Sequence, residues 1–322
     1  MNELNYTYAV ARIRCNESKL LSHEKIEQLI CASDFFEAYK RLGDIGYETH
    51  GGAPVSDVLA VERKKAWQLL CEIAPDKKEL EFLTVRNSFM NLKAALKSVV
   101  SGKSAGEFFV EPANVADDII KEAVTSKNFS SLPEYMADTA SYCYDILTSK
   151  DDGQLSDSVI DKKSLETYLE FAKRSKNPVL KDIAEFTVAC ADIKIAYRSA
   201  LTKKDIGFLD ASLAECAAID LPALKKAAAS GVDSVIELLS HTEYSEAAEL
   251  LKTSPTAFEK WCDDTVISKI IPAKYNAFGI LPLIGFYLAK ENEVKTVRII
   301  MAAKESGLPE SAIRERVRKL YV

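Results

Sequence analysis

Two short stretches of the chain contain residue types that could do chemistry. Gly102-Lys103-Ser104 matches the end of a phosphate-binding loop, but Lys97 stands where such a loop needs its first glycine. His23-Glu24-x-x-Glu27 resembles the helix of a zinc protease, except that a carboxylate replaces the second imidazole. The first stretch ends a predicted helix instead of opening one. We therefore expect a glycine stop in the first stretch and a solvated histidine in the second, and neither a cofactor nor a metal ion.

The rest of the sequence contains no recognisable catalytic pattern. The whole chain has three histidines and no Gly-x-Ser-x-Gly, and none of its seven cysteines lies in a family signature or a Cys-x-x-Cys pair. A Cys–His pair assembled by folding stays open as an alternative. On these residues we expect no catalytic residues, and a protein that is not an enzyme.

Lysine recurs at one position of a repeated helical pattern. Asn91-Leu92-Lys93, Asp192-Ile193-Lys194 and Glu293-Val294-Lys295 follow one another at intervals of 101 residues. A shift of three residues in the last copy, onto Thr296-Val297-Arg298, fits about as well, because Lys295 and Arg298 lie on one helical face. The candidate partner-binding residues are therefore Lys93, Lys194, Lys295 and Arg298. They could meet an acidic surface of a partner, or they could be solvated or paired within their own unit.

The repetition extends beyond the lysines. Residues 58–106 align with residues 159–207 without a gap, and a similar helix that ends in tyrosine precedes each copy. A fixed long period is typical of modules that stack on one another. The sequence therefore predicts three helical repeats, at 1–106, 107–207 and 208–322.

Composition and charge narrow the class of protein. The chain has 322 residues, of which 48% are hydrophobic and 28% charged, as expected for a globular protein with two or three cores. A net charge of −6 argues against a nucleic-acid partner. The odd number of unpatterned cysteines favours a reducing cytosol. The first five residues show no secretory signal, and the longest apolar run, residues 277–289, is too short to insert in a membrane.

Helix signals dominate, and strict two-residue alternation is almost absent, so the fold class is predicted to be all-α. Ser22 and Asp34 are expected to cap helices, and Gly102 to end one. Four further capping boxes are predicted, at Ser131-x-x-Glu134, Ser212-x-x-Glu215, Ser234-x-x-Glu237 and Thr256-x-x-Glu259.

Several stretches together resemble the C subunit of the V-type (A/V-type) rotary ATPases, the relative of the eukaryotic d subunit. They are Tyr6-x-Tyr8-x-x-Ala11-Arg12-Ile13-Arg14, Asn91-Leu92-Lys93 and the carboxyl-terminal run from Glu291 to Arg314. The third motif departs from the family, which usually has Asn where this chain has Thr296. The second motif departs as well, since it carries Asp192.

The resemblance implies three similar helical domains arranged as a funnel about a pseudo-threefold axis. It implies a non-catalytic rotor subunit on the cytoplasmic face of the membrane, peripheral to it. The expected partners are the proteolipid subunits of the rotor ring and the D and F subunits of the central shaft, and torque passes through the chain from one to the other. From the residues alone, an α-helical repeat scaffold that holds peptides or other proteins is the alternative.

Overall fold

A computed structural model describes residues 6–102, 104–150 and 152–322 of the chain. The described residues form helices and turns and contain no strand, so the predicted all-α fold is confirmed. They fold as two compact units, residues 1–77 with 250–322 and residues 78–249.

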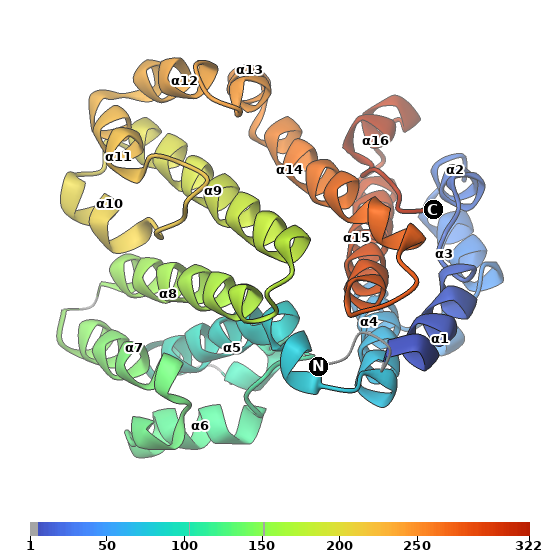
Figure 1. The fold of residues 1–322 in the computed structure, drawn as a ribbon, viewed down its shortest axis with the longest axis horizontal. Helices are drawn as coiled ribbons and strands as arrows, with labels where there is room; N and C mark the ends of the chain where they lie inside the picture. The colour runs from blue at the N-terminus through green and yellow to red at the C-terminus, as the bar shows by residue number, and fades with distance from the viewer. Residues whose placement is uncertain (1–5, 103, 151) are drawn as a thin grey trace. The chain divides into compact units, whose positions relative to one another are not determined.

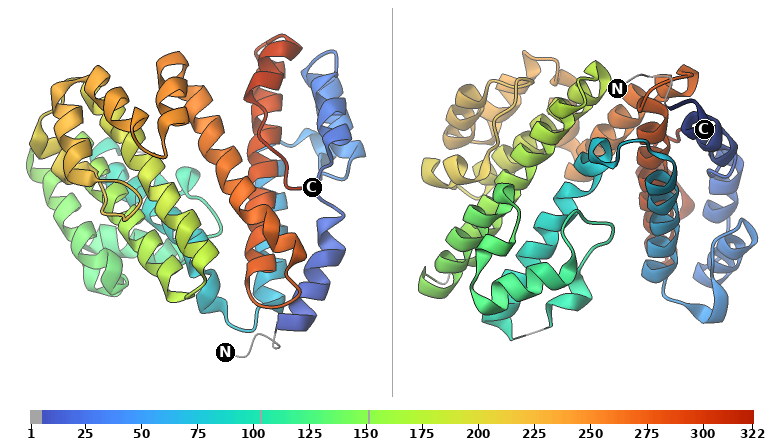
Figure 2. Two further views of the ribbon diagram at one scale, coloured as in Figure 1. Left: turned by 45° about the horizontal axis from the view of Figure 1, so that its top comes forward. Right: turned by 60° about the horizontal axis from the view of Figure 1, so that its bottom comes forward.

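Unit 1 joins the two ends of the chain. Its helices are α1 (Thr7–Glu17), α2 (His23–Ile30), α3 (Phe35–Asp44), α4 (Val55–Ile73), α14 (Pro255–Ile270), α15 (Leu281–Glu305) and α16 (Glu310–Arg316). Helix α15 packs against α1, α3, α4 and α14, which places it at the centre of the unit (Figure 2). A single apolar cluster contains side chains of α2, α3, α4, α15 and α16, so the N-terminal and C-terminal helices share one core.

Unit 2 is continuous in sequence. Its helices are α5 (Glu81–Ser101), α6 (Asp117–Ser126), α7 (Glu134–Asp145), α8 (Gly153–Arg174), α9 (Pro178–Leu201), α10 (Ile206–Ser212), α11 (Leu221–Ser230) and α12 (Val232–Ser240). The long helices α5, α8 and α9 pack in succession, with α6 against α5 and α11 against α9 (Figure 1). Helix α13 (Ser245–Thr253) crosses the division between the units.

Helix ends follow the predicted capping residues only in part. Ser22 and Asp34 accept hydrogen bonds from the third residue of their helices, and Gly102 ends α5 with a φ of 67°. The four further boxes are wrong. Pro133, Gly231 and Ser254 stand at the helix starts in place of Ser131, Ser234 and Thr256, and Ser212 ends α10 instead of opening a helix. Ser-x-x-Glu also occurs inside and after helices, because a short polar residue is tolerated at several helix positions.

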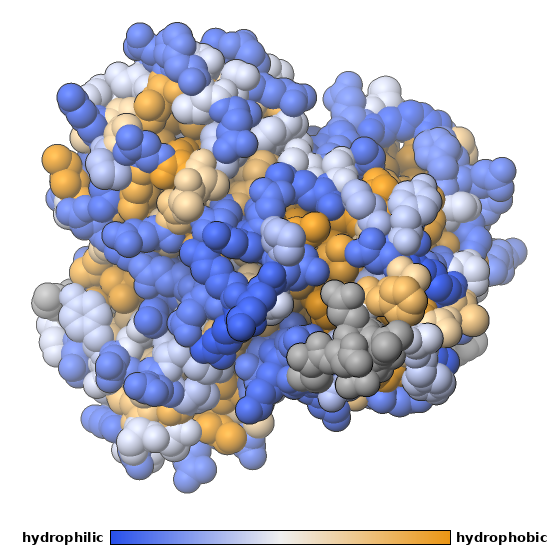
Figure 3. All heavy atoms as spheres, viewed as in Figure 1, coloured by the Kyte–Doolittle hydropathy of each residue, from blue (hydrophilic) through white to orange (hydrophobic). Residues whose placement is uncertain are grey.

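None of the described helices is long and apolar enough to cross a bilayer. The face in Figure 3 is mostly hydrophilic, and its apolar residues reach the surface in separate patches.

The two compact units are a different division of the chain from the three repeats. The repeats and their threefold arrangement therefore stay a prediction.

Candidate interaction surface

The first residue of the repeated motif is buried in all three copies. Asn91 on α5 and Asp192 on α9 have no exposed surface, and Glu293 on α15 is 3% exposed. Buried polar groups need hydrogen-bond partners. Each of these side chains finds one in a backbone N–H of another segment, and we call them the clamp residues.

Asn91 holds the segment that leads into α6. Its Oδ1 accepts a hydrogen bond from the Val110 N–H at 2.7 Å, and its Nδ2 donates to the Val110 carbonyl oxygen at 3.1 Å. The same Nδ2 lies 3.3 Å from Asp117 Oδ1. Burial raises the pKa of Asp117 above its ordinary value. The amide therefore satisfies a donor and an acceptor of one backbone residue.

Asp192 holds the segment that leads into α11. Its Oδ1 accepts a hydrogen bond from the Ala214 N–H at 3.0 Å. Its buried Oδ2 has no hydrogen-bond partner among the described residues. Burial raises the pKa of Asp192 to about 7, and the Ala214 N–H opposes that rise only in part. The carboxyl group is therefore largely protonated below neutral pH.

Glu293 holds the segment that leads into α2. Its Oε2 accepts from the Leu21 N–H at 2.6 Å, and its Oε1 accepts from the Tyr47 hydroxyl at 2.7 Å and from Lys290 Nζ at 2.5 Å. Lys290 is itself only 7% exposed. One carboxylate thus ties the N-terminal part of the chain to α15, and a buried lysine compensates its charge.

The three clamps favour the 101-residue register over the shifted one. In that register the first residue of each motif bonds the segment that precedes a short helix. Asn91 bonds the segment before α6, Asp192 the segment before α11 and Glu293 the segment before α2. In the shifted register Thr296 would take this role, but its buried Oγ1 has no hydrogen-bond partner among the described residues. Lys295 is therefore the counterpart of Lys93 and Lys194. The sequence analysis missed the clamp residues, although a polar residue at a fixed position of an apolar helix was a usable signal.

The predicted lysines lie on these same helices, two residues beyond each clamp. Lys93 forms an ion pair with Asp161 of α8, and 22% of its side chain is exposed. Lys194 is half-buried on α9. Lys93 and Lys194 belong to unit 2, whereas Lys295 and Arg298 belong to unit 1. Their role in partner binding stays a prediction.

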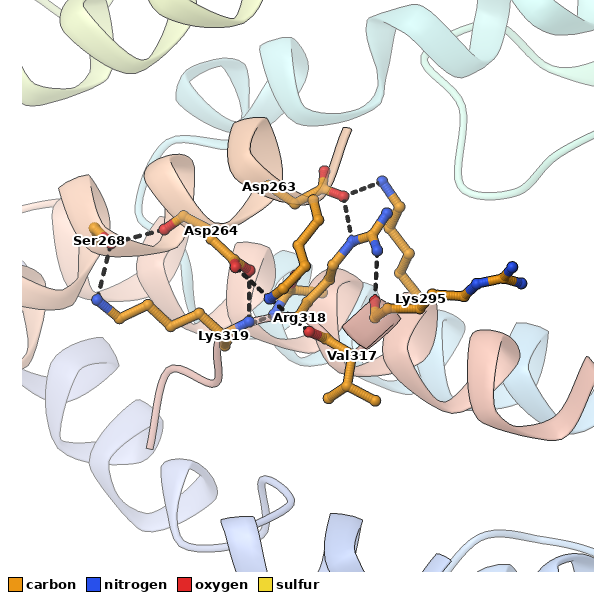
Figure 4. Close-up of polar contacts among 10 residues, drawn as sticks. Asp263, Asp264, Ser268, Lys295, Val317, Arg318 and Lys319 are labelled. Atoms are coloured by element: carbon orange, nitrogen blue, oxygen red, sulfur yellow. Dashed lines mark hydrogen bonds and ion pairs between the residues drawn. The ribbon is translucent and has the colours of Figure 1, made fainter. Parts of the chain in front are cut away.

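Lys295 lies in a network that holds the C-terminal segment (Figure 4). Asp263 Oδ2 accepts from Arg318 Nε at 2.7 Å and pairs with Lys295 Nζ at 2.5 Å. The neighbouring Asp264 accepts from the Lys319 N–H at 2.6 Å. The side chain of Arg318 is 4% exposed and that of Lys295 is 45% exposed, so Lys295 is the solvent-facing edge of this network. Arg298, one turn further along α15, is exposed.

The stretches considered for chemistry assemble no site in the described part of the chain. His23 Nε2 lies 4.0 Å from Glu27 Oε1 with 81% of the His23 side chain exposed, as expected for a solvated histidine. No group of three His, Cys, Asp or Glu side chains among residues 6–102, 104–150 and 152–322 is placed to hold a metal ion. Lys103 of the phosphate-loop fragment and the first five residues lie outside the described residues.

The chain is similar to known proteins over nearly its whole length. The C subunit of the V-type sodium ATPase of Enterococcus hirae is 24% identical, over 96% of this chain and 97% of its own. The C subunit of the A-type ATP synthase of Methanocaldococcus jannaschii is also 24% identical, over 96% and 85%. The counterpart from Thermococcus kodakarensis is 20% identical, over 97% and 90%. The family model of the ATP synthase (C/AC39) subunit matches residues 9–316, and the chain therefore belongs to that family of V-type and A-type ATPase subunits.

Proposed function

We propose that this chain is the non-catalytic rotor subunit that couples the central shaft to the membrane ring of a V-type or A-type rotary ATPase. It would lie on the cytoplasmic face of the membrane, with the D and F subunits of the shaft on one side and the proteolipid ring on the other. The observation that carries the proposal is the family match, which spans residues 9–316. The whole chain, and not one module of it, shares the family's pattern.

The physical character of the fold supports a mechanical role. Helices packed through buried side chains form a stiff body, because close-packed interiors compress little. The clamp residues add polar ties between the long helices and their neighbouring segments, and Glu293 ties the two ends of the chain together. A protein that passes torque needs such ties, since any loose segment would absorb the rotation.

We further propose that the three repeats surround a pseudo-threefold axis. The support is local: one position in each repeat makes the same kind of side-chain bond to the backbone. In the third copy the bonded segment comes from the start of the chain, as a closed ring of repeats requires.

Co-purification tests the proposed function. An affinity-tagged chain, expressed in its own cells and recovered from solubilised membranes, is expected to bring the shaft subunits and the proteolipid with it. Recovery of the tagged chain with neither would overturn the proposal. Recovery of assorted peptides without these subunits would favour the repeat scaffold.

Charge reversal tests the predicted cations. Replacing Lys93, Lys194 and Arg298 with glutamate is expected to lower recovery of the shaft or the ring while the helical circular dichroism stays unchanged. Arg298 is reversed in place of Lys295 because Lys295 pairs with Asp263 in the network that holds the C-terminal segment. Asp161→Asn is the matched control, because it breaks the ion pair of Lys93 but keeps the cation. Equal recovery with the reversed and the original chain would show that these cations do not contact a partner.

A further inference from the structure

Residues 317–322 lie on unit 1 in the way that a peptide ligand lies on its receptor. They follow α16 without regular secondary structure, and we call them the strap. Side chains of α14 and α15 bond them (Figure 4). Arg318 and Tyr321 are each 4% exposed, whereas Lys319 is exposed. The strap therefore has two buried anchors, three residues apart.

The backbone of the strap is bonded by side chains of both helices. Lys260 Nζ of α14 donates to the Val317 carbonyl oxygen at 2.7 Å. Asp264 Oδ1, also of α14, accepts from the Lys319 N–H at 2.6 Å. Asn292 Nδ2 of α15 donates to the Lys319 carbonyl oxygen at 2.7 Å. Main-chain bonds of this kind give affinity for an extended segment, because they do not depend on the side chain of the bonded residue.

The two anchors fit particular features of the helices. Arg318 Nε donates to Asp263 Oδ2 of α14 at 2.7 Å, which is a charge-assisted bond. The Tyr321 hydroxyl donates to Glu17 Oε1 of α1 at 3.3 Å. It also lies against Gly285 inside α15, where an added Cβ would stand 3.1 Å from the hydroxyl oxygen. Glycine inside a helix costs stability relative to alanine, and here the missing Cβ leaves room for the tyrosine.

Helix α16 is attached to unit 1 independently of the strap. Its Ile313 lies in the apolar core cluster, and its Arg314 pairs with Glu27 of α2 at 2.6 Å. Val317 and Leu320 of the strap are only partly buried at the border of that cluster. The strap can therefore leave its helices while α16 stays in place.

The strap adds a second attachment between α14 and α15. Three side chains of α14 bond it, and Asn292 of α15 bonds it from the other helix. The chain enters α14 directly from α13, which crosses the division between the two units. The docked strap thus fixes to α15 the helix by which the chain returns to unit 1.

We propose that this face of α14 and α15 is a binding site for an extended peptide with arginine and tyrosine three residues apart. The residues that form the site are Lys260, Asp263, Asp264, Gly285 and Asn292. The strap occupies the site as a detachable ligand within the same chain and holds α14 against α15. The emptied site takes the same sequence from a separate peptide. This inference does not rest on the proposed rotary function.

Cutting the folded chain tests whether the strap is a ligand. A site for a specific protease, inserted after the exposed Arg316, lets the complete chain fold before the strap is cut off and dialysed away. A fluorescent peptide with the sequence of residues 317–322 is expected to rebind the cut chain saturably, and to bind the uncut chain much more weakly because its site is filled. A strap that stays bound until the whole chain unfolds would overturn the proposal. A scrambled peptide that binds equally well would also overturn it.

Peptide variants separate recognition of the backbone from recognition of side chains. N-methylation of the Lys319 nitrogen removes the donor to Asp264, and binding is expected to weaken roughly tenfold or more. Lys319→Ala is the matched control, because it keeps that N–H and loses only the exposed bond of the ammonium to Ser268, so binding should weaken by no more than about threefold. Tyr321→Ala should weaken binding at least as much as N-methylation, since the buried ring is lost. Equal binding of the N-methylated and the Lys319→Ala peptides would contradict the proposed site.

Hydrogen exchange tests the strap in the original chain without a cut. The Lys319 amide is expected to exchange through local opening, ahead of core amides of α15 such as that of Ile300. In the cut chain, amides of α14 should exchange faster when the site is empty and slow again when the peptide is added. Exchange of the Lys319 amide only together with the α15 core, or α14 amides that do not respond to the peptide, would show that residues 317–322 are not a detachable strap.

Discussion

The clamp residues of both units accept a hydrogen bond from a backbone N–H of another segment, but they differ in charge and in how far along the chain that segment lies. In unit 2, Asn91 and Asp192 bond backbone segments that lie 19 and 22 residues further along the chain. In unit 1, Glu293 bonds Leu21, which is 272 residues away, and it also accepts from Tyr47 and Lys290. The loop that Glu293 closes is therefore far longer, and closing it costs more chain entropy. A carboxylate that accepts from three donors is a stronger tie for that closure than a single amide.

Removing the Glu293 carboxylate should produce the largest loss. In Glu293→Ala the buried Lys290 ammonium loses its closest partner, and the Leu21 N–H and the Tyr47 hydroxyl lose their acceptor. Breaking a buried ion pair costs about 3–5 kcal/mol of unfolding free energy. Urea denaturation measures the loss, and limited proteolysis should show release of the segment around α1 and α2 before the rest. A loss no larger than that of Asn91→Ala would contradict the comparison.

Asp192→Asn should stabilise the protein, and only at high pH. The pKa of Asp192 is about 7 in the folded chain against 3.8 unfolded, so the folded state binds the extra proton between these values. Stability from this group therefore falls as pH rises from about 4 to about 7. A shift of this size corresponds to about 4 kcal/mol above pH 7. The amide keeps an oxygen for the Ala214 N–H, as Asn91 does for Val110.

Urea denaturation of Asp192→Asn and the original chain between pH 4.5 and 8.5 checks this expectation. The two curves should lie closest at the acid end, separate up to about pH 7 and keep a constant gap above it. A constant difference across the range would mean that Asp192 is ionised throughout, and that the two unit 2 clamps differ in charge at every pH tested.

Asn91→Ala should have the smallest effect of the three. It leaves the Val110 N–H and carbonyl groups without the side-chain amide, which costs about 1–3 kcal/mol. Hydrogen exchange at the Val110 amide should accelerate more than that at Ala214, which a separate clamp holds. Equal acceleration at both amides would indicate that the unit 2 clamps open together as one element.

Local signals predicted most of the helices, and they failed at particular ends. Gly102 ends α5 because glycine adopts the left-handed backbone conformation of that position without steric cost. That preference acts within one helical turn. The box at Ser234 failed because Gly231 starts α12 three residues earlier, and tertiary packing decides between such nearby starts. The period of 101 residues identified the motif helices and their lysines, but not which side chain of the motif is buried.

The sequence by itself determined the all-α class, the places of the long helices and the spacing of the motif, because periodicity and capping act over a few residues. Only the tertiary structure decided that Asn91, Asp192 and Glu293 are buried, since burial depends on which segments cover a helix face. It also decided that Glu293 reaches Leu21 across 272 residues. No local rule selects a partner at that distance, because the choice follows from the packing of both chain ends into one core.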